Sequence, residues 1–144
     1  MRPTARRLVS VSVLICVVWV VGTVVSVVAK WPSQALGPGN PNNVAGELLS
    51  RGTPLSPPLP MMVAFVVLVI LVPSRKWWGM LGVVGLCLLA VLTLLGHLAE
   101  ALAPSTAQVP RAVLFASGVL GVLLCPALLV LGIMDLMDRA QARQ

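Results

Sequence analysis

The chain has 144 residues, of which 58% are hydrophobic and only 10% are charged. Soluble domains are about a quarter charged, so this chain has too little polar surface to cover a water-soluble globule, and a disordered chain would need the opposite balance. The composition therefore excludes both classes and predicts a single membrane domain over residues 1–144, built from four apolar runs.

The first apolar run, residues 8–29, contains 22 residues without a charge. A helix needs about 20 residues to cross the hydrocarbon core of a bilayer. The run begins with alternating Val and Ser, as a strand would, but an isolated strand leaves its backbone groups unpaired in lipid, so we expect a helix. Basic residues before the run and Val27-Val28-Ala29 at its end also resemble a cleavable signal peptide. Because signal-peptide cores are only about 7 to 15 residues long, we favour an uncleaved anchor.

The segment that follows, residues 30–56, is rich in proline and glycine and is predicted to be an outer loop. Asn43 is expected to cap a short helix that stops at Gly52, with Glu47 and Arg51 paired one turn apart. We interpret the loop as a connector lying on the membrane. A lid or partner-docking loop is the alternative.

The remaining runs are residues 57–72, 77–99 and 112–134. The last two are long enough to cross a bilayer. The run at residues 57–72 has only 16 residues and would have to thin the bilayer locally to cross it. A re-entrant segment is the alternative for this run. Short connectors on either side of residues 77–99 force neighbouring helices to run antiparallel. The predicted fold is therefore an all-α polytopic membrane protein with four transmembrane helices arranged as two antiparallel hairpins.

Basic residues flank the four runs unevenly. Three basic residues lie in the segments predicted on one side of the membrane, namely Lys30, Arg51 and Arg111. Seven lie in the segments on the other side, namely Arg2, Arg6, Arg7, Arg75, Lys76, Arg139 and Arg143. Since the basic side is normally cytoplasmic, both termini are predicted to face the cytoplasm from the cell (inner) membrane. Eight arginines against two lysines fit a bacterial gene of high GC content. The net charge of +6 favours contact with anionic lipid rather than nucleic acid.

Small residues recur at helical spacing in the third and fourth runs, including Gly82 and Gly85 in one and Ser117 and Gly121 in the other. Such faces allow helix backbones to approach closely, and packing drives helix association in lipid. We therefore expect these residues to form contacts between the first, third and fourth helices. A seam between copies of the chain is the alternative.

His97 and Glu100 are the two candidate ionisable groups within the predicted membrane region, one turn apart at the outer end of the third run. They could handle a proton, but we favour the interpretation that both side chains are hydrated at the interface. Two ligands are too few for a metal site, and we expect no metal and no cofactor. Ser117 is expected at a similar depth to His97, a pairing that an intramembrane serine protease uses. Phe115 replaces the first glycine of the Gly-x-Ser-Gly motif of such rhomboid-type proteases, so we predict no catalytic residue.

These features predict a non-catalytic accessory or scaffold subunit of a membrane complex, or a homo-oligomer. The expected partners are the lipid bilayer and other membrane-protein subunits or a second copy. The alternative is a small transporter or channel subunit with a polar site around His97 and Glu100. No Asp or Glu lies in the middle of a run, which weakens that alternative. An enzyme with an outer site at His97, Glu100 and Ser117 is the third hypothesis.

Overall fold

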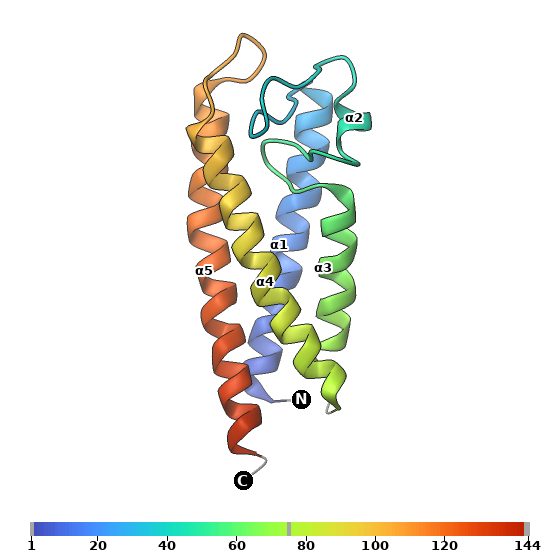
Figure 1. The fold of residues 1–144 in the computed structure, drawn as a ribbon, viewed down its shortest axis with the longest axis vertical. Helices are drawn as coiled ribbons and strands as arrows, with labels where there is room; N and C mark the ends of the chain where they lie inside the picture. The colour runs from blue at the N-terminus through green and yellow to red at the C-terminus, as the bar shows by residue number, and fades with distance from the viewer. Residues whose placement is uncertain (1, 75, 143–144) are drawn as a thin grey trace.

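The computed structural model describes residues 2–74 and 76–142. These residues form helices and loops without any β-strand, so the all-helical prediction is confirmed for them. The helices are α1 (Pro3–Val28), α2 (Val44–Glu47), α3 (Leu59–Leu71), α4 (Trp77–Leu102) and α5 (Arg111–Gln141). The start of α1 and the end of α5 lie at one end of the bundle, called here the terminal end (Figure 1). The connections before α3 and after α4 lie at the opposite, loop end. Arg75 and Arg143, two of the basic residues in the orientation prediction, lie outside the described residues.

Three of these helices, α1, α4 and α5, are long and apolar enough to cross a membrane, while α3 is a shorter apolar helix of 13 residues. At 1.5 Å per residue, α3 is only about 20 Å long. The predicted second run began at residue 57, but the helix begins at Leu59, because Pro58 has an extended backbone with ψ 145°. A residue that precedes a proline also avoids the helical region, which keeps Pro57 outside the helix. Four spans and two hairpins therefore remain a prediction.

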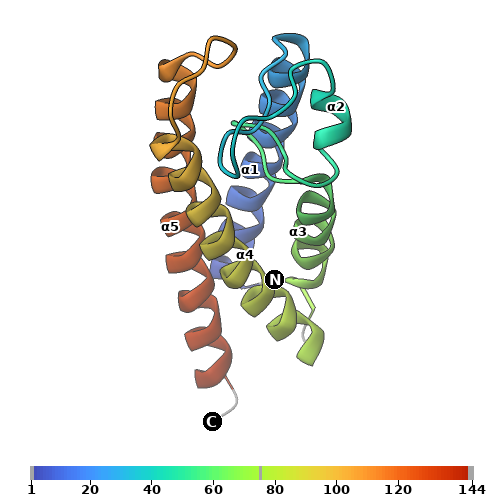
Figure 2. The same ribbon diagram turned by 45° about the horizontal axis from the view of Figure 1, so that its top comes forward.

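Within the described residues, helix α4 packs against α3 and α5 and not against α1, which corrects the expected contact between the first and third apolar helices. It packs most extensively against α5 and next against α3, whereas α1 packs mainly against α5. Figures 1 and 2 show α4 crossing the bundle diagonally, from beside α3 at the terminal end to beside α5 at the loop end. Because of this crossing, Gly82 and Gly85 lie against α3, and not against the first or fourth helix as expected. A Cβ atom added at Gly82 would lie 2.9 Å from the Leu68 carbonyl oxygen.

The centre of the bundle is apolar. The rings of Trp19 and Phe65 meet edge to face, with centroids 4.8 Å apart, and Leu86 and Leu128 are buried around them. Helix α1 contributes to this core through one narrow stripe with a spacing of three or four residues, at Ala5, Leu8, Ser12, Ile15, Trp19, Gly22 and Ser26. Most valines on its other faces, such as Val17, Val21 and Val24, are exposed, as expected for side chains that contact lipid.

The loop between α1 and α3 folds over the loop end of the bundle. Helix α2 begins after Asn43 as predicted but ends at Glu47, before the predicted stop at Gly52. Glu47 pairs with Arg51 at 4.0 Å, and Gly52 has a φ of +77°. Asn43 stands at the N-cap, but its side chain makes no capping hydrogen bond, which corrects that detail. Ser33 and Gln34 are buried, so part of the segment is packed into the protein in addition to connecting two helices.

Candidate polar site at the loop end

His97 and Ser117 face each other across the contact between α4 and α5. His97 Nδ1 lies 2.8 Å from the Ser117 hydroxyl oxygen, and both side chains are buried. Gly121, one turn after Ser117, makes room for the imidazole, since a Cβ atom there would lie 2.6 Å from His97 Cβ. The sequence predicted that His97 and Ser117 lie at a similar depth, and in the structure they form a direct hydrogen bond.

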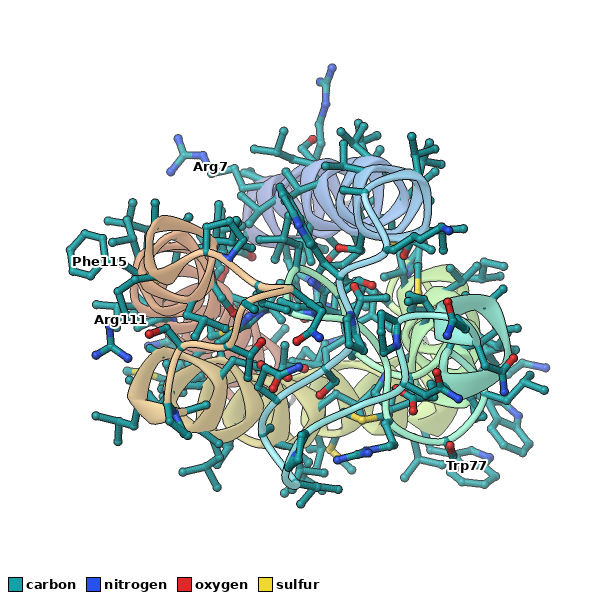
Figure 3. The ribbon with its side chains drawn as sticks, turned by 90° about the horizontal axis from the view of Figure 1, so that it is seen from above. Arg7, Trp77, Arg111 and Phe115 are labelled. Atoms are coloured by element: carbon teal, nitrogen blue, oxygen red, sulfur yellow. The ribbon has the colours of Figure 1, made fainter. Side chains whose placement is uncertain are left out.

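Glu100 lies one turn beyond His97 and is held by the loop that follows α1. Its carboxylate accepts hydrogen bonds from the Ser33 hydroxyl and from the Gln34 backbone N–H, the latter at 3.0 Å to Oε1 and 2.9 Å to Oε2. The hydrated interpretation is wrong for both residues, because His97 is only 7% and Glu100 only 4% exposed. Figure 3, which looks down on the loop end, shows the loop segments lying across the helix ends that carry these groups.

A cavity of about 80 Å³ lies between this loop and α4. Its lining includes Arg51, Ser56, Met61, Thr93, His97 and Glu100. A smaller void of about 10 Å³, the size of a single water, also borders Thr93 and His97 and reaches Trp19 and Phe65. The Thr93 hydroxyl is buried and has no hydrogen-bond partner among the described residues. No sequence pattern indicates this cavity, because its walls come from segments far apart in the chain.

The geometry does not favour nucleophilic catalysis by Ser117. A serine nucleophile needs space beside its hydroxyl for the carbonyl carbon that it attacks. Ser117 is fully buried and borders neither cavity, whereas its partner His97 borders both. Ser117 therefore orients the imidazole. The part of the chain that the structure describes also contains no group of three or more His, Cys, Asp or Glu side chains able to hold a metal ion.

We expect a fluorophosphonate probe, which labels activated serines, to leave the detergent-purified protein unlabelled. The reason is the absence of space at the Ser117 hydroxyl. In-gel fluorescence measures the labelling, with a known serine hydrolase as positive control. Labelling that disappears in Ser117→Ala would show that the site opens to substrates.

A second polar cluster lies at the terminal end and was not predicted as a site. Arg139 Nε donates to Asp135 at 2.6 Å, and its other nitrogens donate to the carbonyl oxygens of Val72 at 2.7 Å and Ser74 at 3.2 Å. Arg139 thus satisfies carbonyl groups at the C-terminal end of α3 that have no partner within the helix. The ion pair of Asp135 and Arg139, one turn apart on α5, is buried, with side-chain exposures of 0% and 7%.

Helix α1 joins this cluster through its first turn. The Thr4 hydroxyl lies 2.7 Å from Asp138 Oδ2 and 3.2 Å from Asp135 Oδ1, and Arg2 lies 3.6 Å from Asp135. Gly79 leaves space for the Arg139 guanidinium, with which any side chain at that position would collide. The cluster therefore connects α1, α3 and α5 at the terminal end of the bundle.

Comparison with models of known protein families, with characterised proteins and with solved structures found no match to this chain. The class of this protein is therefore inferred from its structure alone. The described chain is an all-helical protein with three apolar helices able to span a membrane, which indicates a membrane location. Two buried polar clusters lie at opposite ends of its bundle.

Proposed function

We propose that the chain is a small four-pass protein of a bacterial cell membrane, with α3 as a short fourth span, two antiparallel hairpins and both termini in the cytoplasm. An even number of passes is supported by the position of the start of α1 and the end of α5 at the same end of the bundle (Figure 1). The cytoplasmic assignment is supported by basic residues at that end, among them Arg6, Arg7 and Lys76.

Within that membrane the protein acts as a non-catalytic accessory or scaffold subunit, or as a homo-oligomer. The observation that carries this proposal is the apolar layer between the two polar clusters. Trp19, Phe65 and Leu128 are packed in the core there, next to Leu86 and Cys125. A path for ions or polar solutes would require polar groups along the bundle, and the side chains that fill this layer are apolar. Glu100 and Arg139 instead bind a loop and a helix end, as structural groups do.

The exposed faces of the bundle are available for a partner within the membrane. On α1, Val17, Val21 and Val24 are each more than half exposed, and on α4 Leu88 is 62% exposed. Figure 3 shows Phe115 of α5 pointing away from the bundle as well. Either another membrane subunit or a second copy of the chain can pack against such faces.

We expect the protein to leave the membrane in a mild detergent as a stoichiometric complex, either with a second copy or with another membrane protein. Native mass spectrometry gives the composition. A photo-crosslinking amino acid at Val21, compared with one at Leu88, then identifies the face involved. A monomer without any partner after gentle extraction, and without crosslinks at either position, contradicts the proposal.

The alternative is a small transporter or channel subunit, and the cavity beside His97 and Glu100 is the observation that favours it. In that case the apolar layer would have to open, or a partner subunit would have to complete the pathway. Solute flux into liposomes containing only this chain, abolished by His97→Ala, would support the alternative and overturn the scaffold function.

A further inference from the structure

Glu100 is a buried carboxylate without a counter-ion. Its hydrogen-bond donors, the Ser33 hydroxyl and the Gln34 backbone N–H, are both neutral. Among residues 2–74 and 76–142, ion pairs are formed by Asp135 and Glu47, but none by Glu100. Burying a carboxylate is costly unless a positive charge pairs with it. The site is therefore suited to a cation from outside the chain.

Two further groups on the same face of α4 border the cavity. Thr93, His97 and Glu100 follow one another at spacings of four and three residues, which places them on one side of the helix. The Thr93 hydroxyl is only 5% exposed and has no partner in the described chain. When His97 Nδ1 donates its proton to Ser117, the Nε2 atom is left as an acceptor. The cavity thus combines one carboxylate with acceptors that hold no other donor.

The composition of the walls favours an organic cation over a metal ion. Calcium takes six to eight oxygen ligands and zinc usually four nitrogen or sulfur ligands, while this cavity offers one carboxylate and one imidazole. Its other walls combine the apolar side chains of Met61, Leu92 and Pro58 with the hydroxyl-bearing residues Ser33, Thr53 and Ser56. A cavity of about 80 Å³ holds several waters, or a molecule of a few heavy atoms. Arg51 also borders it, but its guanidinium donates to the Gly37 carbonyl oxygen at 2.7 Å and pairs with Glu47.

We propose that this cavity binds a small primary ammonium ion, with Glu100 as its counter-ion and with Thr93 and His97 accepting its remaining N–H groups. An ammonium group has three donors, which matches these three acceptors. Its short alkyl group lies against Met61 and Leu92. The site goes beyond the scaffold function and does not depend on whether a partner subunit is found.

The test is the binding of methylammonium and ethylammonium to the full-length protein in detergent, measured by isothermal titration calorimetry. Glu100→Gln removes the charge and is expected to weaken binding on the order of a hundredfold. Thr93→Val keeps the shape of the side chain and is expected to weaken it about tenfold. Asp138→Asn, the matched control, also removes a carboxylate charge, but at the terminal end of the bundle away from the cavity, and should leave binding unchanged.

Several results would overturn the proposal. These are the absence of amine binding to the unmodified protein, equal binding by Glu100→Gln, and binding of sodium or calcium ions in place of the amines. If Glu100→Gln does not fold, Thr93→Val decides, because unchanged amine binding by that variant contradicts the assigned site.

Discussion

Replacing Arg139 by methionine is expected to lower the free energy of unfolding by about 3 kcal/mol. The substitution leaves the fully buried Asp135 with only the more distant Arg2 and the Thr4 hydroxyl, and it removes the donors to Val72 and Ser74. Removing only one partner of a buried ion pair lowers the free energy of unfolding by more than the intact pair contributes, because the other partner remains as an uncompensated buried charge. Equilibrium unfolding in mixed micelles, followed by circular dichroism, measures the change.

Arg7→Met is the matched control for Arg139→Met. Arg7 is exposed, and Figure 3 shows its side chain pointing away from the bundle, so this variant should change the free energy of unfolding by less than about 0.5 kcal/mol. The double variant Asp135→Leu with Arg139→Met removes both charges and is expected to regain part of the loss. Equal effects of Arg139→Met and Arg7→Met would mean that the terminal-end cluster contributes nothing specific.

The positions of the long helices could be predicted because local composition determines them. Three apolar runs coincide with α1, α4 and α5, since a long run in lipid has no alternative to a helix. Their ends were less accurate. The apolar run ends at residue 134, but α5 continues to Gln141, and Asp135 and Arg139 turn inward and keep that part of the helix packed.

The polar contacts were predictable only where helical spacing determines them. The similar depth of His97 and Ser117 follows from counting turns along two neighbouring helices, and their hydrogen bond agrees with it. The partners of Glu100 lie 66 and 67 residues away in the chain, and those of Arg139 lie 65 and 67 residues away. No periodicity links such positions, so the hydrated interpretation of Glu100 followed from the helix alone and missed the loop that covers it.

Two glycine-to-alanine substitutions are expected to change stability in opposite directions. A methyl group at Gly121 would lie 2.6 Å from His97 Cβ, so Gly121→Ala forces α4 and α5 apart and should cost about 1 to 3 kcal/mol. At Gly96 no atom lies within 4 Å of an added Cβ, and alanine there should stabilise the helix by up to about 1 kcal/mol. The same micelle unfolding experiment measures both variants.

The Gly121→Ala variant also distinguishes two interpretations of the small residues on α5. They can allow close packing of helices within one chain, or they can form a seam between two copies of the chain. If Gly121 served a contact between copies, Gly121→Ala would lower the oligomeric mass and leave the unfolding of the single chain unchanged. Packing within the chain has the opposite consequence, because the His97 imidazole is displaced from Ser117 while the mass stays constant. Unchanged stability of Gly121→Ala together with a reduced mass would therefore assign the glycine face of α5 to an interface between chains.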